Sequence, residues 1–252
     1  MRVAIEKAGV VGTSSVGVYN LSHIGRVGEY TEWAANQGFI AIAVFAGNAE
    51  KGKGVVAPFG GSKGLWGTNP IALAIPRPDA PFSLDFATSA IALGKASHAL
   101  KTGEQVPEFT AFDRDGFPTR EPKQVLEGGA FLPFGGHKGY GLSFAIEIFA
   151  GFWIGAASPV APGDDSGPGM FIITIDPDRF QAPEHFQDSL DVLYEYVRSC
   201  PPSEGFDEVL IPGDPERRRL TSPESMRISV PDEVQVDMNQ IADDLGITLV
   251  WS

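Results

Sequence analysis

The chain has 252 residues, 43% of them hydrophobic and 20% charged, a composition typical of a globular protein rather than a disordered or fibrous one. Its formal net charge of −13 argues against partners that carry many phosphates, so we expect binding neither to nucleic acid nor to an anionic membrane surface. The single cysteine, Cys200, allows no disulfide within one chain, which fits a reducing compartment.

No apolar run reaches the ~18 residues that a membrane-spanning helix needs. Residues 144–157 form the most apolar stretch, but this stretch carries Glu147 and has the length of a buried core helix. Residues 1–7 lack the apolar centre of a signal peptide. These features predict a cytoplasmic protein.

The first elements in chain order are a helix end and a strand. Residues 1–8 are typical of the last turns of a helix that Gly9 terminates, and 10–19 of a turn followed by a strand. An isolated helix this short is only marginally stable, because helix nucleation is costly. A further helical region is therefore expected before residue 1.

The rest of the chain alternates strands with helices. Residues 39–45 are apolar on both faces of a strand, which indicates a sheet covered on both sides. Further strands are predicted at 71–75, 82–86 and 170–175, and helices at 27–36, 89–100, 140–153, 182–198 and 233–245. This alternation predicts an α/β fold with a central sheet and helices on both faces.

His23 lies in a loop between a predicted strand and a predicted helix, a common place for catalytic residues. An imidazole titrates near neutral pH, so it can accept and return a proton. Oxidation of an alcohol requires removal of the hydroxyl proton as hydride leaves the carbon. The alternative is a histidine that only hydrogen-bonds a turn.

A glycine-rich segment, 135–141, opens the helix predicted over 140–153. Glycines let backbone amides approach a phosphate, and a helix N-terminus favours an anion. Lys138 adds a positive charge and His137 can donate hydrogen bonds. The spacing is not the GxGxxG dinucleotide fingerprint. The alternative is a glycine turn that packs against the sheet.

Two further segments combine turns with polar side chains. In 84–89, Thr88 or Ser89 could cap the following helix or contact a nicotinamide carboxamide or pyrophosphate. Residues 211–217 are typical of a surface turn after a strand. The adjacent Arg217, Arg218 and Arg219 could contact a phosphate or form a solvated face. The four histidines are too widely spaced along the chain to predict a metal site.

Together these segments form an ordered set of motifs. They are SHIGRVGEY from Ser22, GTNPIA from Gly67, DFATS from Asp85, LPFGGHKGYG from Leu132 and IPGDPE from Ile211. The set resembles the malate/L-lactate dehydrogenase family that lacks a Rossmann fold. Relatives in that family include ureidoglycolate, sulfolactate and diketogulonate dehydrogenases and the cyclic ketimine reductases. The resemblance covers essentially the whole chain.

The resemblance implies a homodimer that uses NAD or NADP and acts on a small 2-hydroxy acid or its keto or imino counterpart. It implies a three-layer α/β/α fold with a mixed sheet and a separate, non-Rossmann cofactor lobe. His23 matches the acceptor of the substrate's hydroxyl proton. Cofactor-contacting stretches match Asn48, Asp85, Phe86, Ala87, Thr88, Ser89, His137, Lys138, Gly213, Asp214 and Pro215.

The resemblance also suggests three parts: 1–45 from a core and substrate domain, 46–200 mainly the cofactor lobe and sheet core, and 201–252 a return to the core. Family members carry a further N-terminal, mostly helical region with substrate-binding residues, which these 252 residues do not include. Two hypotheses follow. The chain is a dehydrogenase, or it is a truncated, catalytically silent fragment that binds dinucleotide or serves as an interaction subunit.

Overall fold

The computed structural model describes residues 1–47, 54–156, 167–222 and 229–250. Asn48 lies outside these residues. Contacts between Cα atoms divide the chain into two units, Met1–Pro212 and Gly213–Ser252. The first unit contains both sheets and the second contains helices α7 (Asp214–Thr221) and α8 (Asp232–Leu245). Each unit is described by itself.

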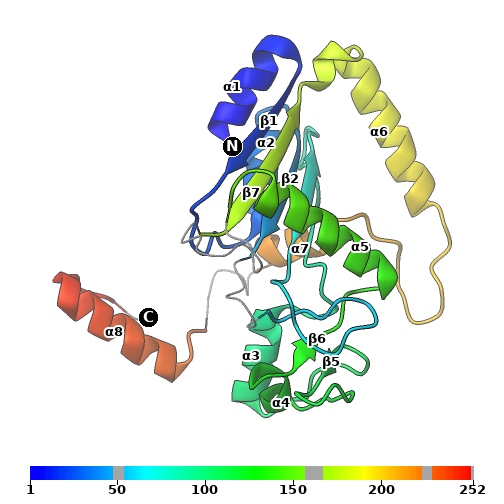
Figure 1. Ribbon diagram of the computed structural model, residues 1–252. Helices are drawn as coiled ribbons and strands as arrows, with labels where there is room; N and C mark the ends of the chain where they lie inside the picture. Colours follow the sequence, from blue (N-terminus) through cyan, green and yellow to red (C-terminus); the bar gives the residue numbers. More distant parts are fainter. Residues whose placement is uncertain (48–53, 157–166, 223–228, 251–252) are drawn as a thin grey trace. The chain divides into compact units, whose positions relative to one another are not determined.

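The first unit is organised around a five-stranded sheet with the order β1-β7-β2-β3-β4 (Figure 1). Its strands are β1 (Thr13–Val18), β2 (Ile40–Ala46), β3 (Ile71–Ile75), β4 (Phe82–Phe86) and β7 (Gly169–Ile175). All pairings described in this sheet are antiparallel, which differs from the mixed sheet that the resemblance implies. The physical reason is local: β2, β3 and β4 follow one another across the sheet and reverse direction at each connection.

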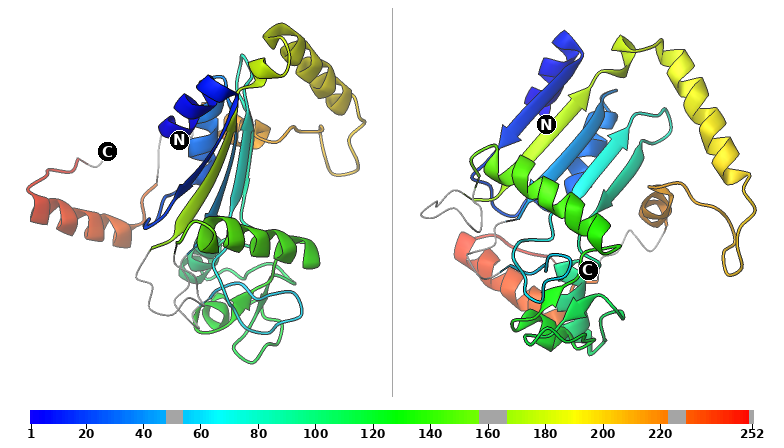
Figure 2. Two further views of the ribbon diagram at one scale, coloured as in Figure 1. Left: turned by 45° about the horizontal axis from the view of Figure 1, so that its top comes forward. Right: turned by 45° about the vertical axis from the view of Figure 1, so that its right-hand side comes forward.

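Helices cover the two faces of this sheet, as the apolar strands predict (Figure 2). Successive strand residues point to opposite faces. Ala43 and Ala72 pack with Ala4 of α1 (Arg2–Val11) and Val27 of α2 (Val27–Ala35). The next positions, on the opposite face, pack against α5 (His137–Ile146) and the π-helix η1 (Glu147–Phe152). The three-layer α/β/α class is thereby confirmed.

A second apolar core lies below the sheet in Figure 1, in a lobe built from α3 (Leu93–Thr102), β5 (Ala111–Phe112), α4 (Pro122–Leu126) and β6 (Ala130–Phe131). Its buried residues are Val56, Trp66, Ile91, Ala96, Val106, Ala111, Val125 and Phe131. Trp66 stacks on Tyr140 of α5, with ring centroids 5.8 Å apart. This stacking attaches the lobe to the helix that crosses the sheet.

Helix α6 (Pro183–Arg198) follows the short 3-10 helix η2 (Pro177–Arg179) and is fastened to the turn between β3 and β4. The Arg77 guanidinium lies 3.8 Å from the centre of the Tyr194 ring and pairs with Asp191 at 2.7 Å. No helix among the described residues is both long and apolar enough to cross a membrane.

Three sequence expectations differ from the structure. Two concern the ends of helices, and one concerns the burial of a helix. Helix α1 continues past Gly9 and stops at Gly12, whose φ of 93° gives the left-handed C-cap. Helix α3 begins at Leu93, so neither Thr88 nor Ser89 caps it. The apolar helix expected to be buried exposes one face, because only the residues that meet the sheet are covered.

Candidate active site

The antiparallel register brings four predicted site segments to one edge of the sheet. Val18 pairs with Met170, Ala46 with Gly169, Val44 with Ile71, and Ile71 with Phe86. The loop with His23, the end of β2 at Gly47, the segment before β3 and the segment after β4 therefore all leave the sheet at the same edge (Figure 2). Segments far apart in the sequence, such as the His23 loop and the segment after β4, meet there because of the register.

His23 lies exposed in the loop between β1 and α2. The loop backbone is fixed on both sides: Leu21 N donates to Pro168 O at 3.0 Å, and Tyr30 Oη donates to Ile24 O at 3.0 Å. Within the described residues the His23 ring has no hydrogen-bond partner. The alternative in which His23 holds the turn is therefore not supported, and the imidazole is free to meet a ligand.

Asp85 joins β4 to the start of α2. Its Oδ2 accepts a hydrogen bond from Gly28 N at 2.8 Å, in the first turn of that helix. A carboxylate at a helix N-terminus satisfies an amide that has no partner inside the helix and is favoured by the helix dipole. Asp85 thus helps to fix the direction in which the His23 loop enters α2.

An ion pair that sequence analysis missed reinforces this connection. Arg26 donates from Nη1 and Nη2 to the two carboxylate oxygens of Glu32, at 2.8 and 2.5 Å, and Ser83 Oγ donates to Glu32 Oε1 at 2.5 Å. Arg26 hydrogen bonding lowers the pKa of Glu32, and the same bond raises the pKa of Arg26. Spacing could not reveal the group, because Ser83 lies on β4, 51 positions along the chain from Glu32 in α2.

The segment after β4 is held from inside the chain. Thr88 Oγ1 donates to Thr68 O and Asn69 O, both at 3.0 Å, and Ser89 Oγ donates to Ile91 O at 2.8 Å. Both side chains are buried. Phe86 is half-exposed and meets the Phe134 ring edge-to-face, with centroids 5.5 Å apart. A ligand would meet Phe86 and the backbone near Ala87 rather than these two hydroxyls.

The glycine-rich segment forms the N-terminus of α5, as the sequence predicts. Gly136 is the N-cap, and both Gly135 and Gly136 have positive φ, 55° and 63°. His137 and Lys138 are exposed in the first turn. Phe134 N donates to Thr88 O at 3.0 Å, which ties this turn to the segment after β4. The amides of Lys138, Gly139 and Tyr140 donate to backbone oxygens of the turn before them. The exposed Lys138 ammonium and the positive end of the helix dipole make this helix start suited to a phosphate.

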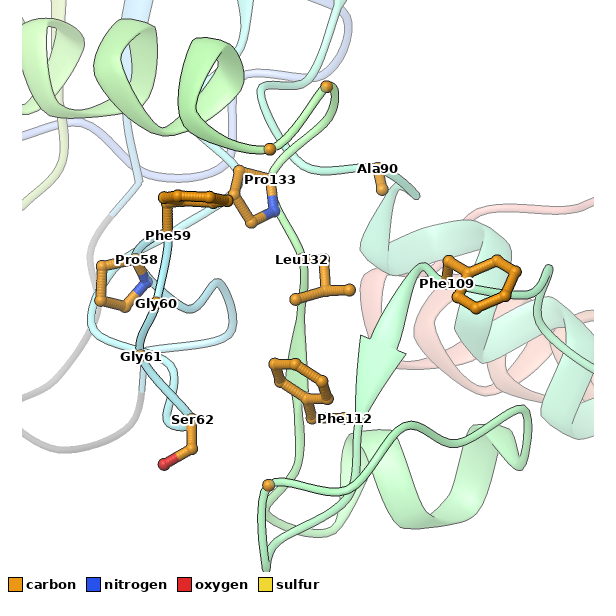
Figure 3. A pocket seen from close by; sticks show the side chains of 13 residues that line it. Pro58, Phe59, Gly60, Gly61, Ser62, Ala90, Phe109, Phe112, Leu132 and Pro133 are labelled. Carbon is orange, nitrogen blue, oxygen red and sulfur yellow. The ribbon is translucent and has the colours of Figure 1, made fainter.

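A cavity of about 580 Å³ lies beside this helix start (Figure 3). Phe59, Leu132, Pro133 and Phe112 line it with apolar groups, and its glycines bring backbone close to its interior (Figure 3). The edge of the Phe59 ring also contacts the His137 ring, with centroids 5.9 Å apart. An apolar cavity of this size next to a helix start with an exposed lysine suits a planar ring with attached phosphates.

Glu147 is a buried titratable group at the start of the π-helix, 4% exposed. Its Oε2 accepts a hydrogen bond from Asn69 Nδ2 at 2.9 Å, and among the described residues its Oε1 has no partner. Burial raises the pKa of Glu147, against the opposing effect of the Asn69 hydrogen bond. A single carboxylate within an apolar run is the sequence signal for this group, but its partner, far away in the chain, is not predictable.

Gly213, Asp214 and Pro215 belong to the second unit. Gly213 is the N-cap of α7 with φ 95°, and the buried carboxylate of Asp214 pairs with the Arg217 guanidinium one turn on. The structure thus places these residues at a helix start rather than in a simple surface turn. Their role toward a cofactor stays a prediction.

Known proteins resemble this chain over nearly all of its length. The family described as Malate/L-lactate dehydrogenase matches residues 1–239. The chain belongs to this family. The malate/(S)-sulfolactate dehydrogenase of Methanothermus fervidus is 38% identical over 257 aligned residues, which cover 100% of this chain and 73% of that protein. The family prediction is confirmed, and with it the prediction of an oxidoreductase.

Further relatives extend the comparison. A Δ1-pyrroline-2-carboxylate/Δ1-piperideine-2-carboxylate reductase of Pseudomonas syringae pv. tomato is 35% identical over 96% of this chain and 68% of its own length. The solved sulfolactate dehydrogenase of Methanocaldococcus jannaschii superposes with a TM-score of 0.82 at 37% identity, covering 98% of this chain and 71% of that chain. These similarities confirm the non-Rossmann dehydrogenase fold.

Proposed function

We propose that the protein transfers a hydride between NAD or NADP and C2 of a small 2-hydroxy acid, with His23 as the proton acceptor. The observation that carries this proposal is the sheet edge, where the exposed His23 loop and the segments bound to the α5 N-terminus converge. Relatives named as malate, sulfolactate and lactate dehydrogenases support the substrate class.

The residues at this edge fit a dinucleotide. The exposed Lys138 ammonium and the positive end of the α5 dipole suit the pyrophosphate, and the neighbouring apolar cavity suits one of the rings. Phe86 and the backbone near Ala87 offer a further surface. When bound, the nicotinamide ring supplies or accepts the hydride.

His23 performs the proton chemistry in this proposal. Its unpaired imidazole accepts the hydroxyl proton in the oxidation direction and returns it in the reduction direction. The hydrogen bonds at Leu21 and Ile24 fix the loop backbone, so less conformational freedom is lost when the ring meets the substrate. Asp85 and the pair of Arg26 with Glu32 hold the same loop from its other end.

The finer assignments remain predictions. Lys95 is exposed on α3 and is a candidate for the 2′-phosphate of NADP; Lys51 and Lys53, with the same candidate role, lie outside the described residues. The homodimer and the cytoplasmic location that we infer from the sequence are proposals of the same standing.

Calorimetric titration with NADH and with NADPH, followed by assays with malate, sulfolactate and lactate, tests the proposal directly. We expect micromolar or tighter binding of one dinucleotide and oxidation of at least one of the three acids. Binding without turnover would support the silent fragment instead, and absence of binding by either dinucleotide would contradict the cofactor assignment.

A further inference from the structure

Asn69 connects three segments of the candidate active site although it lies inside the protein. It is completely buried, and its backbone has a positive φ of 37°. Its Oδ1 accepts a hydrogen bond from Gly47 N at 3.2 Å, and its backbone oxygen accepts one from Thr88 Oγ1 at 3.0 Å. The end of β2 is thus fixed to the side chain of this residue, and the segment after β4 to its backbone oxygen.

The amide nitrogen of Asn69 binds the helix that begins with His137 and Lys138. Asn69 Nδ2 donates to Ser143 O at 3.3 Å and to Glu147 Oε2 at 2.9 Å. Because Thr88 O accepts from Phe134 N, the turn before α5 is attached to the same group. One buried residue therefore sets the position of Gly47, Thr88 and α5 relative to one another. Its side-chain amide binds Gly47 and α5, and its backbone oxygen binds Thr88.

Glu147 decides which way this amide points. A carboxylate accepts hydrogen bonds and donates none when ionised, so it selects the nitrogen of Asn69 and turns the amide oxygen toward Gly47. Gly47 N needs an acceptor, so the opposite orientation would leave two donors facing each other. Burying a carboxyl group is costly, and an apolar side chain would fill the same space between α5 and the sheet at less cost.

We propose that Glu147 is a positioning residue for the dinucleotide, acting through Asn69 to hold Gly47, Thr88 and α5 in the arrangement that binds the cofactor. This inference rests on the proposed function. It assigns Glu147 no contact with the substrate or with the hydride. Glu147 therefore affects the affinity for the cofactor and does not affect the proton transfer at His23.

The test compares three variants by titration with the dinucleotide that the wild-type protein binds, together with steady-state kinetics. Glu147→Leu removes the acceptor and should raise the Kd and KM of the cofactor about 10-fold, which corresponds to about 1.4 kcal/mol, with kcat at saturating cofactor little changed. Glu147→Gln keeps an acceptor oxygen for Asn69 Nδ2 and should restore wild-type affinity.

Ser143→Ala is the matched control, because Ser143 lies one helical turn away, is equally buried, and has a hydroxyl without a partner among the described residues. It should leave Kd unchanged. Should Glu147→Leu fail to fold, Glu147→Asp, which withdraws the carboxylate from Asn69, should weaken cofactor binding in the same way.

Each outcome bears on one proposal. If the wild-type protein binds neither NADH nor NADPH, the proposed function is wrong. If it binds and Glu147→Leu or Glu147→Asp binds equally well, the role of Glu147 is wrong. An equal loss in Ser143→Ala, or a loss in Glu147→Gln as large as in Glu147→Leu, would also overturn it, because general disturbance of α5 would then account for the effect.

Discussion

The His23 side chain combines a fixed backbone with an exposed ring that has no partner among the described residues. We predict that His23→Ala lowers kcat at least ~100-fold, the usual contribution of a positioned general base. Because the side chain is exposed, the melting temperature should change little. Steady-state kinetics and thermal unfolding measure the two effects.

His98→Ala provides the control for this variant, since His98 is an exposed histidine on α3 that takes no part in the proposed chemistry. It should keep the wild-type rate. Near-normal turnover by His23→Ala would remove His23 from the role of proton acceptor.

Glu147 makes the stability of the protein depend on pH. Burial raises its pKa from the ordinary 4.5, so the folded chain binds this proton more tightly than the unfolded chain. Its stabilising contribution is fully present below about pH 4.5 and is lost as the pH rises through the raised pKa of the folded state. Stability from this group therefore falls with rising pH.

The glutamine of Glu147→Gln does not titrate. The free energy of unfolding of this variant minus that of the wild-type protein should therefore be larger at about pH 9 than at about pH 4. Urea denaturation of both proteins at the two pH values measures this difference, and the contributions of all other groups cancel in the comparison. The same difference in unfolding free energy at both pH values would contradict a raised pKa.

At the scale of elements, the start of α5 depends on a close approach of backbone to backbone. A Cβ atom on Gly139 would overlap the carbonyl oxygen of Phe134 and lie 2.9 Å from that of Thr88. We predict that Gly139→Ala displaces the glycine-rich turn and weakens cofactor binding together with stability. Calorimetric titration measures the cofactor affinity of this variant, and thermal unfolding measures its stability.

Gly141→Ala is the paired control on the same helix. A Cβ atom there meets nothing within 4 Å, and alanine is more favourable than glycine inside a helix by about 1 kcal/mol. This variant should bind cofactor normally and unfold at an equal or higher temperature. A Gly139→Ala protein that behaves like Gly141→Ala would show that the close approach does not matter.

The elements themselves were largely predictable, because periodicity and β-branched or aromatic content act over short stretches. The predicted bounds of β3 and β4 agree with the structure, and the strand predicted at 39–45 is shifted by one residue. The start of α3 was missed because the buried Thr88 hydroxyl donates to Thr68 O in another segment, while the Ser89 hydroxyl donates to Ile91 O two residues on. The residues around Thr88 do not indicate a hydrogen-bond partner as distant in the sequence as Thr68.

The sequence predicts which segments contribute to the candidate site, but it does not predict how these segments contact one another. Asp85 was expected to contact the cofactor, and the structure shows its carboxylate on Gly28 N at the start of α2. The network of Asn69 with Glu147 joins residues 78 positions apart, so no spacing rule could find it. Register, which decides which segments share an edge, is set by tertiary packing.

At the scale of the whole molecule, the net charge of −13 opposes an anionic dinucleotide. Affinity must then come from local positive groups, of which the exposed Lys138 ammonium at the start of α5 is the strongest candidate. A ligand that binds only the folded state stabilises it, by about 2.7 kcal/mol at a concentration of 100 Kd. The wild-type melting temperature should therefore rise with NADH or NADPH.

Lys138→Ala and Lys123→Ala distinguish the effect of a charge at the start of α5 from the effect of the overall net charge on dinucleotide affinity. Each change removes one positive charge from an exposed position. Both make the molecule equally more negative, so any effect of the overall field on dinucleotide binding is the same in the two variants. Lys138→Ala should need a higher cofactor concentration for the same rise in melting temperature, while Lys123→Ala, on α4, should follow the wild-type curve. Equal losses in both would mean that the overall charge, and not the start of α5, controls dinucleotide affinity.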